Sequence, residues 1–400
     1  MKAPAGSKAL SIILLVVAEL AGMSLWFTSA AVLPGMVAEA GISAVRQALL
    51  SSGVQAGFVT GALFFSITGI PDRFDPRRVI AVAGVCAGVC NLTLVGLAPG
   101  SAGAIAARFM TGALLAGVYP VGMKIAVGWG TRDRGFLVGV LVGALVFGNS
   151  VPFLVSFLGG ADWRLAIAIV SAIASLGCLA VLPAGLGPHH ARSARFDPGA
   201  IGLAWRDRNI RSAYLGYLGH MWELYAMWAW AGAAVLVSYA HSMPPDGAAR
   251  LATLTAFVGI ACGAITCVLA GRVADRIGKA EVAIAAMAVS GLCGLLTAAT
   301  FGGPVWITFL LVVVWGISVI PDSAQFSALV ADYAPPTHVG SLLTFQTALG
   351  FALTIVTVQA APLVAATFGW PLVLAATALG PAFGIVAMLP LVRRKRGLPA

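Results

Sequence analysis

Charge is what this sequence of 400 residues has least of. Asp, Glu, Lys and Arg make up 10% of it and hydrophobic residues 60%, whereas charged residues make up roughly 25% of an average soluble protein. The mean hydropathy is +0.97. These values exclude a soluble enzyme and indicate that most of the chain lies in a lipid bilayer.

Motifs for nucleotides, metals and covalent catalysis are also missing. No P-loop, zinc motif or nucleophile–base pair appears, so we expect no cofactor, no metal, no enzymatic reaction and no ATP-driven step. The six cysteines lie within apolar runs and are interpreted as small packing residues. The chain is basic, but its Lys and Arg form short clusters between apolar runs. That pattern is typical of membrane topology, and we expect no nucleic-acid partner.

Apolar runs long enough to cross a bilayer, about 20 residues each, occur twelve times. They are residues 9–34, 47–70, 79–98, 102–127, 136–158, 164–185, 210–239, 250–270, 281–301, 305–330, 340–367 and 371–391. We therefore predict an all-α integral membrane protein with twelve transmembrane helices in two six-helix bundles. The predicted division is an N-terminal bundle at 1–186, a cytoplasmic linker at 187–209 and a C-terminal bundle at 210–400.

The basic residues predict the orientation. Nineteen Lys and Arg lie at one set of helix ends, and only Arg46, Arg164 and Arg250 lie at the other. Because positive charge stays on the cytoplasmic side, both termini and the linker are predicted to be cytoplasmic, in a multi-pass protein of the inner membrane.

The two halves resemble each other. The segment from Glu19 to Trp26 aligns with the segment from Glu223 to Trp230, with Glu, Leu, Met and Trp at the same spacing. Asp72 and Asp275, and then Pro120 and Pro321, recur at nearly the same offset. Such a parallel repeat of six helices plus six is a known transporter architecture.

A loop after the eighth run, GRVADRIGKA, carries the most specific motif. Its pattern is Gly, then Asp-Arg, then Gly and a basic residue. The matching positions are Gly271, Asp275, Arg276, Gly278 and Lys279, and the first-half copy keeps Asp72 and Arg73. Together with Arg108 and Gly112 in the fourth run, these residues make the chain resemble the major facilitator superfamily. The resemblance implies secondary transport, and the loop would form a cytoplasmic gate.

One branch of that superfamily is faintly similar. The stretches YPVGMKIAVGW and FGNSV resemble porters of small inorganic anions such as nitrate or cyanate. Nitrate porters carry substrate-binding arginines in the second and eighth helices, whereas residues 47–70 and 250–270 have no interior basic residue.

Ionisable residues inside membrane helices are costly and mark functional sites. Glu19, Arg108, Glu223 and Asp322 fall within the first, fourth, seventh and tenth runs. In the family that the chain resembles, these four helices line the central cavity. Glu19 lies about ten residues, or ~15 Å, into the first run, near the middle of the bilayer.

Helical spacing groups further residues with these charges. Met23 and Trp26 share a face with Glu19, and the same face of the seventh run carries His220, Glu223, Met227 and Trp230. The three carboxyl groups could load and release protons, with His220 as a relay and Arg108 as a charge partner or anion contact. Tyr119 and Gln325 are further expected substrate neighbours, and aromatics beside carboxyl groups suit a cationic or zwitterionic solute. Alternatively, neutral Glu side chains lock helices together.

The sequence favours a proton-coupled secondary transporter of a small solute that works by alternating access, with a lean towards uptake by symport. Its expected partners are that solute, protons and the bilayer, and it is expected to be a monomer. Three alternatives stay open. They are a small-anion porter that uses Arg108, a copper importer that uses Met and His side chains, and a membrane receptor or assembly factor that no longer transports.

Overall fold

The computed structural model describes residues 7–130, 133–159, 162–189, 199, 201–335 and 337–395, and these contain helices and no strand. The helices of the first half are α1 (Lys8–Met23), α2 (Thr28–Ala40), α3 (Ala44–Thr68), α4 (Ile70–Arg73), α5 (Pro76–Leu92), the 3-10 turn η1 (Thr93–Val95), α6 (Ala102–Leu115), α7 (Tyr119–Trp129), α8 (Arg134–Gly159) and α9 (Trp163–Leu179). Those of the second half are α10 (Ile201–Arg206), α11 (Arg208–Tyr239), α12 (Pro245–Ile277), α13 (Lys279–Ala299), α14 (Val305–Ser318), α15 (Ser323–Tyr333), α16 (Val339–Phe368), α17 (Trp370–Thr377) and α18 (Leu379–Lys395).

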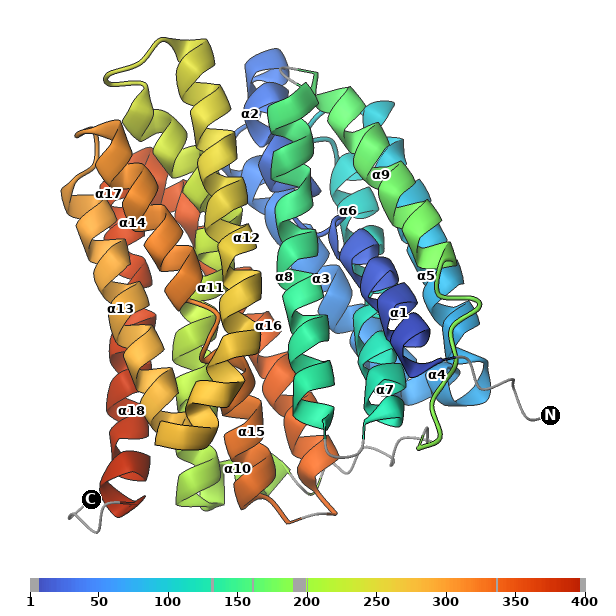
Figure 1. Cartoon of the computed structure of the whole chain (residues 1–400). Helices are drawn as coiled ribbons and strands as arrows, with labels where there is room; N and C mark the ends of the chain where they lie inside the picture. The colour runs from blue at the N-terminus through green and yellow to red at the C-terminus, as the bar shows by residue number, and fades with distance from the viewer. Residues whose placement is uncertain are drawn as a thin grey trace.

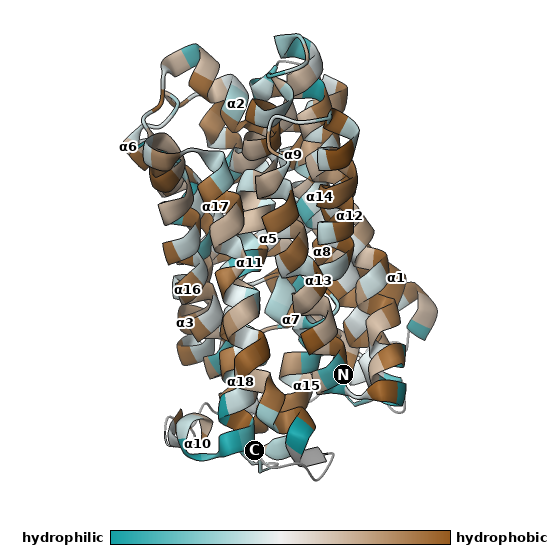
Figure 2. Ribbon diagram, turned by 90° about the vertical axis from the view of Figure 1, so that its left-hand side faces the viewer, coloured by the Kyte–Doolittle hydropathy of each residue, from teal (hydrophilic) through white to brown (hydrophobic). Residues whose placement is uncertain are grey.

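Twelve segments of the described chain account for the spans. Ten are long and apolar enough to cross a membrane, and several of these join two consecutive helices, as in Lys8–Ala40 and Val305–Tyr333. The other two are α9, a shorter apolar helix, and α11, whose 32 residues extend about 48 Å at 1.5 Å per residue. Figure 2 shows a mostly hydrophobic middle with hydrophilic residues towards the two ends. The predicted fold class of an all-α, twelve-span membrane protein is confirmed.

The helices form two side-by-side bundles, α1–α9 and α11–α18 (Figure 1). The bundles meet mainly where α8 packs on α12 and α3 packs on α16. At the second contact the Gln359 side-chain amide donates to Ser52 Oγ over 3.1 Å. Much of the linker predicted at 187–209 lies outside the described residues, so its boundaries stay a prediction.

Inside the bundles three spans are interrupted by three or four residues, and the twelfth by Ala378 alone. The first breaks at residues 24–27 between α1 and α2, the fourth at 116–118 between α6 and α7, and the tenth at 319–322 between α14 and α15. Irregular backbone at membrane depth is tolerated only where it is buried in protein or lines a cavity. In transporters such broken helices frame the substrate site. The seventh span, α11, is continuous.

Close helix crossings depend on glycine. A Cβ atom on Gly316 of α14 would lie 1.6 Å from the carbonyl oxygen of Gly259 on α12. A Cβ atom on Gly112 of α6 would lie 2.0 Å from Val54 O of α3. Small residues at such crossings let the backbones of membrane helices approach each other.

We predict that Gly316→Ala lowers the stability of the protein, because the added methyl forces α12 and α14 apart. Overpacking of this kind costs about 1–3 kcal/mol. The measurement is the thermal unfolding midpoint of the purified protein in detergent. Gly340→Ala is the control, since a Cβ atom there meets nothing within 4 Å. Equal midpoints for the two variants would contradict the crossing geometry.

Candidate functional site

Glu19 is a buried carboxyl group without a hydrogen-bonding partner. It lies on α1, is 1% exposed, and neither of its oxygens has a hydrogen-bond partner among the described residues. Gly122 of α7 faces it, and a Cβ atom there would lie 2.7 Å from Glu19 Oε2. The missing side chain at Gly122 therefore leaves room for the carboxyl group.

Arg108 holds the break in the first span. Its guanidinium, fully buried on α6, donates to the carbonyl oxygens of Leu25 and Trp26, the former over 2.9 Å. It also donates to Asn91 Oδ1 over 2.8 Å, and the Asn91 amide donates to Ser171 Oγ. The guanidinium thus donates to backbone carbonyl oxygens that the break in the helix leaves available. We had predicted a charge partner or an anion contact, and the described residues place no carboxylate within ion-pair distance of this guanidinium.

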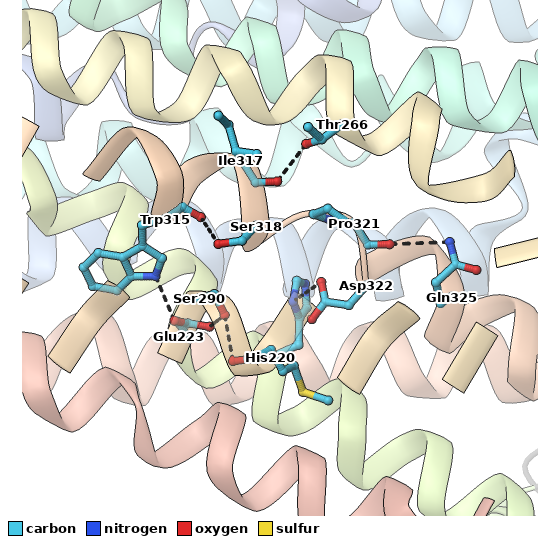
Figure 3. A network of polar contacts seen from close by, with 11 residues as sticks. His220, Glu223, Thr266, Ser290, Trp315, Ile317, Ser318, Pro321, Asp322 and Gln325 are labelled. Carbon is cyan, nitrogen blue, oxygen red and sulfur yellow. Dashed lines mark hydrogen bonds and ion pairs between the residues drawn. The ribbon is translucent and has the colours of Figure 1, made fainter. Parts of the chain in front are cut away.

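Glu223 is as buried as Glu19 but has two donors (Figure 3). Ser290 of α13 donates its hydroxyl to Oε2 over 2.7 Å, and Trp315 of α14 donates its indole N–H to Oε1 over 2.8 Å. An indole nitrogen can only donate, so Oε1 is an acceptor. The two symmetry-related glutamates therefore have opposite surroundings.

His220 and Asp322 form a buried pair next to Glu223 (Figure 3). His220 Nδ1 lies 2.9 Å from Asp322 Oδ1, and the two side chains are 0% and 2% exposed. Asp322 lies at the break before α15, and Gln325, one turn later, donates to Pro321 O over 3.4 Å. The rings of Phe326 and Tyr217 lie 5.6 and 6.2 Å from the imidazole. The structure thus brings together two ionisable side chains that the sequence placed on separate helices.

An aromatic cluster joins the two bundles at Trp26. The Trp26 ring lies 4.9 Å from Phe58 of α3, 5.5 Å from Phe351 of α16 and 5.7 Å from Tyr225 of α11. All four side chains are buried. The sequence analysis named Trp26, but not Phe58 or Phe351, which are apolar residues in apolar helices and carry no distinguishing signal.

The other predicted site residues have different surroundings. Trp230 donates to Val358 O over 2.9 Å and packs on Trp370, within the second bundle. Met23 and Met227 are buried in the core, whereas Tyr119 is partly exposed. No group of three or more His, Cys, Asp or Glu side chains in the described part of the chain is arranged to hold a metal ion.

The predicted gate residues differ between the two copies. In the first, Lys124 of α7 pairs with Asp72, and Arg73 is exposed. In the second, Lys279 pairs with Asp332 of α15 over 2.5 Å.

The GRVADRIGKA loop of the second half turns at a glycine. Gly278 separates α12 from α13 with φ of 117°, a value that favours glycine. Asp275 and Arg276 are exposed in the last turn of α12, and Gly271 is exposed one turn before them. Neither charge has an ion-pair partner among the described residues. The role of this loop as a cytoplasmic gate stays a prediction.

Twelve spans, broken helices and buried carboxyl groups are typical of a membrane transporter. The model of the Major Facilitator Superfamily matches residues 14–320. The chain belongs to this superfamily.

Two similar proteins are transporters. A gallate transporter of Pseudomonas putida is 33% identical over 155 residues, which is 35% of this chain and 34% of that protein. The chain therefore matches about a third of its relative's length. The crystal structure of a mutant of the nucleoside transporter NupG has a TM-score of 0.70 at 13% identity, covering 95% of this chain and 99% of that one. This second likeness shows the shared fold.

We predict that Arg108→Met destabilises the protein, because it leaves carbonyl oxygens at the break of the first span without their side-chain donor. Each unsatisfied buried acceptor costs about 1–3 kcal/mol. Thermal unfolding in detergent measures the effect. Arg46→Met, at an exposed arginine, is the control and should melt like the wild type. If Arg108→Met also melts like the wild type, the guanidinium does not support the break.

Proposed function

We propose that the chain is a proton-coupled secondary active transporter of a small organic solute, working by alternating access in the inner membrane. Three carboxyl groups, Glu19, Glu223 and Asp322, would take up and release the coupling protons. The coupling ion, the solute and the three residue roles are parts of this proposal.

The observation that carries the proposal is the absence of a permanent cation beside these carboxyl groups. They are at most 1% exposed, and no Lys or Arg of the described residues pairs with any of them. Arg108, the buried arginine, is occupied by carbonyl groups. An uncompensated buried charge costs several kcal/mol, so these groups are favoured as neutral acids whenever no cation or water reaches them.

The division into two bundles supports the exchange of these protons with either side. The bundles meet along α8–α12 and α3–α16, and a rocking motion of one bundle against the other would expose the buried acids to each side in turn. The broken first, fourth and tenth spans are the places where the backbone can adjust.

The gallate transporter supports an organic acid as the solute. Its name favours an anion, whereas the aromatic residues alone suggested a cation. The cluster of Trp26, Phe58, Tyr225 and Phe351 lies between the two bundles, where its rings suit a planar solute. Gallate is therefore the first probe.

The test measures uptake of labelled gallate into proteoliposomes when the outside is more acidic than the inside. We expect accumulation above equilibrium, abolished by a protonophore. We predict that Glu19→Gln, Glu223→Gln and Asp322→Asn each reduce this accumulation to the level seen without a gradient, because an amide cannot exchange a proton. The matched control is Asp246→Asn, which changes an exposed acid in the first turn of α12.

A panel of organic acids, neutral solutes and cations under the same pH step identifies the solute if gallate is not carried. Wild-type-like accumulation in all three variants contradicts the proposal. Accumulation that ignores the pH step in the wild-type protein does so too.

A further inference from the structure

His220 and Asp322 are two buried ionisable groups whose charges balance with one proton between them. Their nearest atoms, Nδ1 and Oδ1, are 2.9 Å apart, and the side chains are 0% and 2% exposed. With one proton, the pair is either imidazolium with carboxylate or imidazole with carboxylic acid, and its net charge is zero in both forms.

We propose that this pair is a binding site for the carboxylate of an aromatic monocarboxylic acid, which binds only together with one additional proton. The inference rests on the proposed function, since it names the substrate class and the coupled proton of that site.

Charge balance carries the inference. A monoanion that enters alone leaves the buried site with a net charge of −1, and a proton that enters alone leaves it with +1. Either state costs several kcal/mol in a buried setting. When both enter, the site is neutral again, so each stabilises the binding of the other.

The proton balance can be written atom by atom. The additional proton goes to the Asp322 carboxylate, which becomes a neutral acid and releases the imidazolium of His220. The imidazolium keeps its own proton, and its N–H groups, which make no hydrogen bond among the described residues, can donate to the substrate carboxylate. No other proton moves, and one anion and one proton are bound per site.

A free donor and two rings favour this ligand. Neither nitrogen of the buried His220 ring has a hydrogen-bond partner among the described residues, although imidazolium donates from both. Nδ1 lies 2.9 Å from Asp322 Oδ1 but outside hydrogen-bond geometry. The rings of Phe326 and Tyr217 flank the imidazole, with centroids 6.0 Å apart from each other. A planar acid could place its carboxylate at His220 and its ring against these two.

The first half has no counterpart of this pair. The residue that aligns with His220 is Val16, and Glu19, its nearest acid along the chain, has no hydrogen-bond partner among the described residues. The inference therefore gives one carboxylate site per chain.

Other titratable groups face the pair, and they do not take over its proton. Glu223 of α11 and Cys267 of α12 interact electrostatically with Asp322, and Tyr119 of α7 interacts with Tyr217. Both oxygens of Glu223 already accept hydrogen bonds, from Ser290 and Trp315. Among the described residues Asp322 has His220 alone as a side-chain ion-pair partner, so it is the acid that changes its proton.

The remaining helices packed against α11 add no titratable group next to the His220–Asp322 pair. No Asp, Glu, Lys, Arg, His, Cys or Tyr occurs in α14, α16 or α17. In α2, α10, α15 and α18 such residues lie at or near a helix end away from the pair, as with Glu39 and Arg393.

The test measures proton uptake on binding, with the purified full chain in detergent and with gallate, benzoate and uncharged benzamide as probes. Calorimetric titration in buffers of different ionisation enthalpy gives the protons taken up per bound molecule. We predict one proton per bound carboxylate and no binding of benzamide. As the pH rises, the affinity of the carboxylates should fall about tenfold for each pH unit, as linkage to one proton requires.

Two variants assign the proton. In Asp322→Asn the empty site is neutral only with an uncharged imidazole, so gallate should still bind with uptake of one proton, which then goes to His220. His220→Gln lacks the cation, so carboxylate binding should weaken by at least about tenfold, the loss of a charge-assisted hydrogen bond. Thermal unfolding shows that each variant is folded, and Asp246→Asn should match the wild type.

Three outcomes overturn the inference. They are binding without proton uptake, proton uptake that is kept in His220→Gln, and no binding of either carboxylate to the wild-type protein. If proton uptake is lost in Glu19→Gln but kept in His220→Gln, the pair is not the coupled site, while the proposed proton-coupled transport stands. Failure of that proposed function would appear instead as solute uptake that ignores the pH step in proteoliposomes.

Discussion

A polar group inside a membrane protein must find its partner within the protein, because lipid offers none. The breaks in three spans leave backbone carbonyls available, and the buried acids add charges that need neutralising. Arg108 donates to the free carbonyl oxygens at the break between α1 and α2. Ser290 and Trp315 donate hydrogen bonds to Glu223, and His220 pairs with Asp322. The position of these donors decides what each buried acid is able to do.

The two halves surround their buried glutamates differently although their sequences repeat. Glu19 has Gly122 beside it and no hydrogen-bond partner among the described residues. Glu223, its counterpart, has two donors and a neighbouring acid–base pair. A duplicated helix can therefore keep the same acid while its neighbours change, and a substrate that binds between unequal halves meets one side that differs from the other.

The sequence alone predicted the spans, the repeat, the superfamily and the position of Glu19 and Glu223 inside spans. Apolar run length and internal alignment carry that information directly. The partners of the acids were not predictable, because helical periodicity says which residues share a face and not which helix that face meets. Trp315 lies in α14, a helix that is apolar almost all round, so no amphipathic pattern marked it as a donor to Glu223. Likewise, Arg108 looked like an ion-pair partner until the break in the first span showed which carbonyls it holds.

The central claim is that an organic anion and a proton cross together, so that transport carries no net charge. The direct measurement is gallate uptake into proteoliposomes in which the membrane potential and the pH gradient are set independently, with potassium and valinomycin controlling the potential. The account predicts uptake that follows the pH gradient and is insensitive to the potential. Uptake driven by the potential and indifferent to the pH gradient would contradict it.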